Sequence, residues 1–194
     1  MKKIILASGS PRRKMLLEWA EIKFEVIVSD ADESFSPGDD PVTVALQIAK
    51  KKNYATAILP GLDLSETIII SADTIVVLDQ KVIGKPKDRN EAIAILSQLS
   101  GRTHEVITAV CISSAQKEHL FHEVTEVVFH EITPQQIEHY VDAYKPYDKA
   151  GAYAIQEWIG VIGIKQIKGD FYNVMGLPVS AVVRSLQESF LHLD

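Results

Sequence analysis

The chain has 194 residues, of which 46% are hydrophobic and 24% charged, so it is long and apolar enough to fold as one domain over residues 1–194. Its net charge of −6 argues against nucleic-acid binding, which needs a broad cationic surface, so any anionic ligand must be met locally. The longest apolar runs fall far short of the roughly 20 residues that cross a bilayer, and no membrane segment is expected.

In the first half of the chain, apolar residues recur at strand or helix spacing in five segments. A short loop of small residues joins the first two, and an acidic loop with a proline and a glycine lies between the third and the fourth. Polar residues interrupt the last segment at Ala72-Asp73-Thr74. The segments are a strand from Lys3 to Ala7, a helix from Pro11 to Ala20, an extended run from Phe24 to Val28, a helix from Pro41 to about Leu59, and β structure from Thr67 to Leu78.

The second half begins with a clearly bounded helix from Asp88 to Leu99. Asp88 is the expected N-cap, Glu91 completes a capping box, and Gly101 follows the end of the helix. The order of the elements predicts an α/β or α+β domain with a mixed sheet. The remaining elements are two long antiparallel strands between His104 and His130, a helix from Thr133-Pro134 to Ala143, strands around Tyr153 and from Val161 to Ile167, and a helix from Val179 to about Phe190.

The single cysteine, Cys111, excludes an internal disulfide and a zinc site made of several thiolates. Its alternating apolar neighbours predict a buried small hydrophobe and not a nucleophile. This cysteine usage fits the reducing cytosol, so a cytoplasmic location is expected. By base rates, a homodimer is the first assembly to consider.

The segment Ser8-Gly9-Ser10-Pro11-Arg12-Arg13 is the strongest indication of a ligand site. A predicted strand runs into a loop of small residues and then into a helix with Ser10 as N-cap and Pro11 as first residue. Free backbone N–H groups, the positive end of the helix dipole and the guanidinium groups of Arg12 and Arg13 would attract a phosphate. An ordinary helix start with two solvated arginines explains the pattern about equally well. The Walker pattern is absent.

Asp73 lies between two apolar β runs, where a strand ends or kinks, so its carboxylate is expected to be partly desolvated and to need a cation. A divalent metal would supply one, and a metal-bound carboxylate can orient or deprotonate a water for attack on phosphorus. Glu33, in the acidic loop, is a candidate second metal ligand. A turn aspartate and a solvated loop glutamate are the alternatives at these two positions.

Further cationic and amide groups are candidates for nucleotide binding. Lys50, Lys51 and Lys52 lie on the second predicted helix, and Lys85 lies in a constrained Gly-Lys-Pro turn. A solvated helix face is the alternative for any one of the three consecutive lysines. Gln156 can pair with a base edge through both its donor and its acceptor, or it can satisfy local backbone groups.

Two other patterns are given no catalytic role. His119 and His122 have a spacing like that of metal ligands, but in a predicted strand their side chains point to opposite faces, so we reject a zinc site. The segment from Gly169 to Pro178 is interpreted as a structured turn into the last helix, with a mainly architectural role.

Six segments resemble the Maf family in order and spacing, over almost the whole chain. Each alone is a modest indication, whereas six in register are very specific. The segments are Ala7-Ser8-Gly9-Ser10-Pro11-Arg12-Arg13, Ser71-Ala72-Asp73-Thr74, Gly84-Lys85-Pro86, Ser100-Gly101-Arg102-Thr103-His104, Asp148-Lys149-Ala150-Gly151-Ala152-Tyr153 and Gly169-Asp170-Phe171-Tyr172-Asn173-Val174-Met175-Gly176-Leu177-Pro178.

The resemblance implies two α/β lobes around a long mixed sheet, similar to the inosine triphosphate pyrophosphatase fold, with nucleotide in the cleft between the lobes. Family members cleave nucleoside triphosphates between the α and β phosphates with Mg²⁺ or Mn²⁺, and release the monophosphate and pyrophosphate. Carried over, Asp73 is the proton acceptor and Glu33 the acidic residue associated with metal and catalysis. The predicted substrate-binding residues, including the cations that hold the triphosphate, are Ser8, Ser10, Arg13, Lys52 and Lys85.

Three positions separate the branches of the family, and Arg12, Thr74 and Gln156 resemble the set of the branch that acts on dTTP and UTP. The branch that prefers 7-methyl-GTP typically has Gln at position 74 and Glu at position 156. An amide suits the imide edge of a pyrimidine, whereas a carboxylate favours a donor-rich or cationic base. Modified pyrimidine nucleotides are further candidate substrates. Asn53 departs from the family, in which an alanine often follows the lysine matched by Lys52, so the match could fall on a neighbouring lysine.

The predicted mechanism uses the metal and the cations to neutralise the triphosphate while Asp73 activates a water. In-line attack of this water at the α-phosphorus then expels pyrophosphate. The alternative from another functional class is a nucleotide-sensing regulator of septum formation and cell division, without essential catalysis. Such a sensor could dispense with Asp73 and Glu33, so the presence of both favours an enzyme.

Overall fold

The computed structural model describes residues 2–36 and 38–190, which form seven strands, seven α-helices and one 3₁₀ helix. Within these residues, no helix is both long and apolar enough to cross a membrane. The strands are β1 (Lys3–Leu6), β2 (Glu25–Val26), β3 (Thr67–Leu78), β4 (Lys81–Ile83), β5 (Thr103–Ser113), β6 (Glu118–Phe129) and β7 (Ile164–Lys168). The helices are α1 (Pro11–Trp19), α2 (Pro41–Ala57), α3 (Arg89–Leu99), α4 (Pro134–Tyr144), the 3₁₀ helix η1 (Ala150–Ala152), α5 (Trp158–Gly163), α6 (Phe171–Met175) and α7 (Val179–Ser189).

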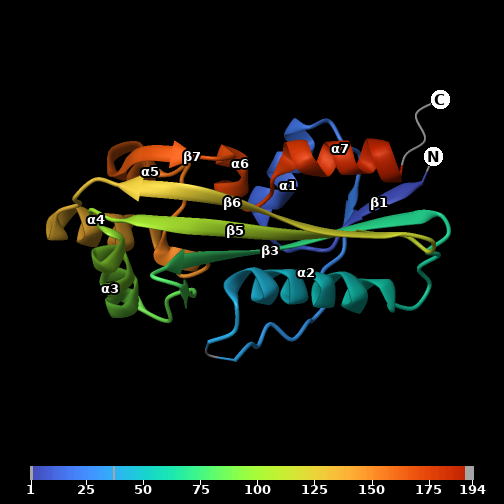
Figure 1. Ribbon diagram of the computed structural model, residues 1–194, viewed down its shortest axis with the longest axis horizontal. Coiled ribbons are helices and arrows are strands. Elements are labelled where there is room, and N and C mark those ends of the chain that lie inside the picture. The colour runs from blue at the N-terminus through green and yellow to red at the C-terminus, as the bar shows by residue number, and fades with distance from the viewer. Residues whose placement is uncertain (1, 37, 191–194) are drawn as a thin grey trace.

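One mixed sheet organises the molecule, as the order of the elements predicted. Its strand order is β2-β1-β3-β5-β6-β7, and β4 pairs with β3 outside this path. β1 runs parallel to β2 and β3, whereas all other pairs are antiparallel. The long strands β3, β5 and β6 run through the whole molecule, with one group of helices at each end of the sheet (Figure 1). This confirms the mixed α/β sheet and the two groups of elements expected around it.

The pairing of β3 leaves an opening on one of its edges. β5 pairs with β3 without a break from Ile69 to Val77. On the opposite edge, β1 pairs with residues 67–70 and β4 pairs with residues 76–78, so residues 71–75 have no strand neighbour there in the described structure. The predicted interruption of this strand at residues 72–74 is therefore wrong. The strand is continuous, and only the pairing along one edge is interrupted.

Helices cover both faces of the sheet, which explains why nearly every side chain of β3 is buried. On one face, Ala45 and Ala49 of α2 pack against Ile75 and Val77. On the other face, α1, α3, α4 and α7 contribute to the main apolar core. In Figure 1, α2 lies on the opposite side of the sheet from α1, α6 and α7.

Buried hydrogen bonds fix the rotation of α2 against the sheet. The side-chain amide of Asn53 donates to the carbonyl oxygens of Ile69 and Cys111, at 3.1 and 3.0 Å. The hydroxyl of Ser71 donates to the carbonyl oxygen of Ala49 at 2.7 Å. A helix held at two neighbouring turns cannot rotate about its axis, so the direction of every other side chain on this part of α2 is also fixed.

The predicted helix caps are largely confirmed. Ser10 caps α1 and accepts a hydrogen bond from the backbone N–H of Arg13, and Asp88 caps α3 in the same way. The predicted capping box of α3 is wrong, because Glu91 accepts its hydrogen bond from the N–H of Lys87, one residue before the cap.

Cys111 is buried, as predicted, and burial raises the pKa of its thiol to about 12.

Of two predicted strands near the C-terminus, one is wrong and the other is confirmed only in its second half. The segment around Tyr153 is a turn that follows η1, although its apolar residues are buried as a strand would require. The run from Val161 to Ile167 begins within α5 and becomes β7 only at Ile164. A short apolar run can be buried in a turn or a helix as well as in a strand, and its periodicity does not distinguish them.

Gly151 generates a prediction about how η1 packs on β3. Its φ is +69°, and a Cβ at this position would lie 2.8 Å from Cγ2 of Val76. We expect Gly151→Ala to lower the free energy of unfolding by about 2–4 kcal/mol, measured by urea denaturation, because the left-handed backbone and the overpacking each cost about 1–2 kcal/mol.

Gly61→Ala is the matched control. Gly61 also has a positive φ, of +84°, but no heavy atom lies within 4 Å of an added Cβ. This variant should show only the backbone cost of about 1–2 kcal/mol. Equal losses in the two variants would contradict the close contact between η1 and β3.

Candidate active site

The predicted site residues line one cavity of about 460 Å³ at the opening in the edge of β3. They come from the loop between β1 and α1, the first turn of α1, the acidic loop, α2, β3, the turn after β4 and the turn after η1. The structure therefore brings together residues from both halves of the chain. They are Ser8, Ser10, Arg12, Arg13, Glu33, Lys52, Asp73, Thr74, Lys85 and Gln156.

The cavity is electropositive although the whole chain carries a net charge of −6. Five basic and three acidic side chains line it, which gives the lining a formal charge of +2. A triphosphate can therefore be attracted locally without a cationic surface elsewhere. The basic residues are Arg12, Arg13, Lys52, Lys85 and Lys149, and the acidic ones are Glu33, Asp73 and Asp148.

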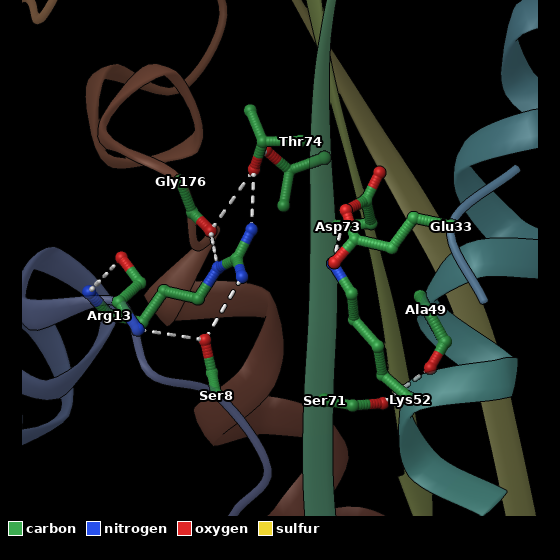
Figure 2. A network of polar contacts seen from close by, with 11 residues as sticks. Ser8, Arg13, Glu33, Ala49, Lys52, Ser71, Asp73, Thr74 and Gly176 are labelled. Carbon is green, nitrogen blue, oxygen red and sulfur yellow. Dashed lines mark hydrogen bonds and ion pairs between the residues drawn. The ribbon is translucent and has the colours of Figure 1, made fainter. Parts of the chain in front are cut away.

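The ammonium group of Lys52 lies between two carboxylates. Its Nζ is 2.7 Å from Oδ1 of Asp73 and 3.0 Å from Oε1 of Glu33 (Figure 2). Asp73 is only 7% exposed, so its carboxylate would be costly to bury without a cation. The expected need of Asp73 for a cation is thus met by Lys52 within the chain itself.

The neighbouring lysines point elsewhere. Nζ of Lys50 lies 2.6 Å from Glu118, and Nζ of Lys51 lies 3.1 Å from Asp32. Asn53 is buried and fixes the rotation of α2, so that Lys52 alone of the three faces the cavity. Of the three lysines, Lys52 is therefore the one that the structure places with the other predicted site residues.

The Glu33 carboxylate is poised to be ionised at neutral pH. Partial burial acts to raise its pKa, but the contact and charge of Lys52, together with the charges of Lys85 and Arg13, outweigh that effect. The pKa of Glu33 consequently lies below its ordinary value of 4.5. Its side chain remains half exposed, and it therefore faces both Lys52 and the solvent of the cavity.

On the other side of β3, the buried guanidinium of Arg13 is held by three acceptors (Figure 2). Nε donates to the carbonyl oxygen of Gly176 at 2.8 Å, Nη1 to Ser8 at 3.1 Å and Nη2 to Thr74 at 3.0 Å. These bonds use three of the five N–H donors of an arginine, and two remain for a ligand. Burial lowers the pKa of Arg13 while the charge of Asp73 opposes this effect, and an arginine stays protonated in either case.

A buried chain of hydrogen bonds continues behind Arg13. The hydroxyls of Thr74 and Thr108 are 2.9 Å apart, and Thr108 donates to the carbonyl oxygen of Asn173 at 3.0 Å. The amide of Asn173 then donates to the carbonyl oxygen of Val106 and to Thr125, at 3.0 and 2.9 Å. This chain fixes α6 on the sheet and thereby places the Gly176 carbonyl against Arg13.

The segment from Gly169 to Pro178 is therefore more than the structured turn that was predicted. It contains α6, and it supplies both Asn173 and the acceptor for Arg13. Sequence reasoning missed this contribution, together with that of Thr108. The available signal was Thr108, which lies in a mainly apolar stretch of β5, where a buried hydroxyl needs a partner.

The cavity is also lined by Gln156 and by an ion pair of Arg12. Gln156 is exposed, and its amide has no hydrogen-bond partner among the described residues, so the predicted alternative of a locally satisfied amide is wrong. Nη1 of Arg12 lies 3.2 Å from Asp148, which connects α1 to the segment before η1. Lys149 lies 2.7 Å from Asp148 and 3.5 Å from Glu157.

The two carboxylates beside Lys52 fit a divalent metal that is completed by substrate. Among residues 2–36 and 38–190, no group of three or more His, Cys, Asp or Glu side chains could hold a metal ion. Asp73 and Glu33 nevertheless face one common cation, the Lys52 ammonium. Mg²⁺ commonly takes one or two carboxylates together with substrate phosphates and waters, which is the donor set available here.

A profile of the family described as "Maf-like protein" matches residues 3–189. Three proteins named dTTP/UTP pyrophosphatase show the extent of the similarity. The one from Cytophaga hutchinsonii is 46% identical over 96% of this chain and 84% of its own length. The one from Bacillus cytotoxicus is 46% identical over 97% and 96%, and the one from Parabacteroides distasonis is 47% identical over 95% of each chain.

Among solved structures, the Ham1 protein of Staphylococcus aureus is similar, with a TM-score of 0.45 and 14% identity. The likeness covers 66% of this chain and 72% of that one.

The hydrogen-bond chain behind Arg13 yields a prediction about stability. Thr108→Val keeps the shape of the side chain but removes the hydroxyl between Thr74 and Asn173. We expect the free energy of unfolding to fall by about 1–3 kcal/mol, the usual cost of leaving buried polar partners unpaired. Thr103→Val, at an exposed position of the same strand, should stay within about 0.5 kcal/mol of wild type, and an equal loss there would contradict this account.

A second prediction concerns the carboxylates beside Lys52. Lys52→Met removes the main group that lowers the pKa of Glu33, so this pKa should rise, as measured by carbon-13 NMR titration of the carboxyl group. Lys51→Met is the control, because Lys51 contacts Asp32, and it should leave the pKa of Glu33 unchanged.

The same variant should change how stability depends on pH. In the wild type, Glu33 is more acidic folded than unfolded, so its contribution is complete above pH 4.5 and is lost as the pH falls through the lowered value. The stability difference between wild type and Lys52→Met should therefore be largest near neutral pH and shrink in acid. A difference that grew in acid would contradict the assignment.

Proposed function

The chain belongs to the Maf family, and on that premise we propose that it is a pyrophosphatase that hydrolyses dTTP and UTP to the nucleoside monophosphate and pyrophosphate. The observation that carries the proposal is the convergence of all the predicted site residues on one electropositive cavity. Relatives with 44–47% identity over at least 95% of this chain are named for the same activity.

The distribution of charge in the cavity supports an orientation for the nucleotide. The start of α1, Lys52 and Lys85 supply cations to the lining, and the turn after η1 supplies the amide of Gln156. We place the triphosphate against the cations and the base beside Gln156. The N–H groups of Gly9 and Arg12 have no partner in the described part of the chain and add donors for phosphate oxygens.

In this orientation, Asp73 is the group that takes a proton from water. Lys52 holds its carboxylate at 2.7 Å and keeps it fixed in a buried position, with Glu33 on the other side of the same ammonium. The water attacks the α-phosphorus, the bond to the bridging oxygen breaks, and pyrophosphate leaves. Arg13, Lys52 and Lys85 stabilise the negative charge on the phosphate oxygens.

A divalent metal, Mg²⁺ or Mn²⁺, is proposed as the cofactor, with Asp73 and Glu33 as its protein ligands. When bound, it would neutralise phosphate charge and act as a Lewis acid on phosphate oxygens. The cationic residues of the cavity would hold the substrate phosphates beside it.

The three specificity positions are proposed to act in different ways. The free amide of Gln156 can accept from N3–H and donate to a carbonyl of uracil or thymine. Thr74 is already engaged with Arg13 and Thr108, so we propose that it acts by positioning the guanidinium. Arg12 forms the ion pair with Asp148 across the cavity and is proposed to contact the nucleotide from there.

The regulatory alternative finds no specific support in the site. A sensor that only binds nucleotide has no need to bury Asp73 beside Lys52, because such a carboxylate would repel the triphosphate. Modified pyrimidine triphosphates share the imide edge and triphosphate of UTP, and they are included in the proposed substrate range. We also propose that the protein acts in the cytoplasm and forms a homodimer.

The products of the reaction test the proposal directly. Incubation with dTTP and Mg²⁺ or Mn²⁺ should yield dTMP and pyrophosphate in equal amounts, quantified by anion-exchange chromatography. Orthophosphate with dTDP would instead show attack at the γ-phosphorus and would overturn the proposed reaction.

The role of Asp73 is tested by Asp73→Asn, which keeps the size of the side chain but removes the base. We expect the turnover rate on dTTP to fall by roughly 10²–10⁴-fold, the range typical for loss of a general base, with a folded protein by circular dichroism. Asp32→Asn, in the acidic loop outside the cavity lining, is the control and should keep its rate. Retained turnover in Asp73→Asn would reassign the base.

A further inference from the structure

The turn that carries Gln156 is held rigidly from outside the cavity. Ala154 and Ile155 are 5% exposed, whereas the next residue, Gln156, is exposed and lines the cavity. Glu157 follows and is the N-cap residue of α5. The turn therefore presents one polar side chain to the ligand. The position of that side chain depends on the contacts that fix residues 154 and 157.

Tyr140 of α4 contacts the turn at both of these residues. Its hydroxyl donates a hydrogen bond to the carboxylate of Glu157 and accepts one from the backbone N–H of Ala154, at 3.3 Å. Tyr140 is fully buried and does not line the cavity. Its hydroxyl thus joins the residue two positions before Gln156 to the residue directly after it.

The Tyr140 hydroxyl both donates and accepts a hydrogen bond. Burial, and then the contact with Glu157, raise the pKa of the phenol, so it remains a protonated donor at physiological pH. Its single hydrogen points to Glu157, which leaves an oxygen lone pair for Ala154. Lys149 lines the cavity, and its Nζ lies 3.5 Å from Oε1 of Glu157. It therefore also helps to hold the Glu157 carboxylate in place.

Close packing prevents the turn from moving in the other direction. A Cβ on Gly160 of α5 would lie 1.8 Å from the carbonyl oxygen of Ile155, so the backbone of the turn and the backbone of α5 are already in contact. The N–H of Gly160 also donates to the carbonyl oxygen of Glu157 at 2.9 Å. The turn is therefore clamped between the Tyr140 hydroxyl and α5.

We propose that Tyr140 is a positioning residue for base recognition, which holds the turn 154–157 so that the amide of Gln156 meets the imide edge of uracil or thymine. The inference rests on the proposed function, since it assigns base reading to Gln156. Tyr140 itself contacts neither substrate nor metal. Its hydroxyl contributes to selectivity between pyrimidines, because cytosine presents an amino group and an unprotonated N3 where uracil presents a carbonyl and N3–H.

The test compares UTP with CTP in the wild type and in Tyr140→Phe. Without the hydroxyl, Ala154 and Glu157 lose a common partner, and Glu157 can turn towards Lys149. We expect kcat/KM for UTP to fall about tenfold, equivalent to about 1.4 kcal/mol, mainly through a higher KM, while the value for CTP stays within about twofold. The selectivity ratio should therefore fall about tenfold. A variant with lower thermal stability but an unchanged ratio would show a purely structural role and overturn the inference.

Tyr144→Phe is the matched control. Tyr144 lies on the same helix, and its ring stacks on that of Tyr140 at 5.0 Å, but it is 40% exposed. This variant should keep the UTP-to-CTP ratio of the wild type, and a fall equal to that of Tyr140→Phe would remove the specific role of the Tyr140 hydroxyl. If Tyr140→Phe does not fold, Glu157→Gln is the second test, because it keeps the shape of the side chain but weakens its hydrogen bond with the Tyr140 hydroxyl. The ratio should then fall by about threefold, and an unchanged ratio would overturn the inference.

Failure of the proposed function would look different. A wild-type protein that neither hydrolyses UTP nor binds the non-hydrolysable α,β-imido analogue of UTP more tightly than that of CTP would refute base reading by Gln156 itself. A wild type that prefers UTP, with a Tyr140→Phe variant that prefers it equally, would refute only the role of Tyr140.

Discussion

The contact of 2.7 Å between the Lys52 ammonium and the Asp73 carboxylate is the interaction on which the rest of the site depends. A carboxylate in the middle of a buried strand is unfavourable unless a cation accompanies it, and the cation must arrive from a fixed direction. Asn53 supplies that direction, because its hydrogen bonds to β3 and β5 fix the rotation of α2. The same ammonium holds Glu33, so one lysine places both acidic groups at the point where a metal and a triphosphate would meet them.

The opening on the edge of β3 turns this buried ion pair into an accessible site. β1 and β4 occupy the two ends of that edge, and between them residues 71–75 have no strand neighbour on that edge in the described part of the chain. Asp73 and Thr74 are consecutive, so their side chains point to opposite faces, one towards Lys52 and the other towards Arg13 (Figure 2). The loop after β1 leaves the sheet beside this opening and brings Ser8 and Arg13 with it. Two electrostatic centres of opposite character are thus built around two adjacent residues of a single strand.

The local chemistry of the site could be predicted from sequence, but its supporting contacts could not. The helix start at Ser10 and Pro11 follows from local preferences, and so does the prediction that the segment around it binds a phosphate. Asp73 was conspicuous because a charged residue within an apolar strand needs a partner. That the partner is Lys52, and not a metal alone, depends on the rotation of α2, which is set by contacts of Asn53 with strands far away in the sequence. The apolar residues around Tyr153 wrongly predict a strand, because burial, and not strand pairing, requires them to be apolar. Tyr140 gave no local signal, since its partners lie 14 and 17 positions further along the chain.

The central claim is that the carboxylate held by Lys52 directs a water to the α-phosphorus. A single-turnover reaction with dTTP in water enriched in oxygen-18, analysed by mass spectrometry, tests it most directly. The account predicts one labelled oxygen in dTMP and none in pyrophosphate during the first turnover. Label in pyrophosphate would place the attack at the β-phosphorus, and unlabelled dTMP would show that a group of the protein, and not water, attacks first. Either result would contradict the role assigned to Asp73.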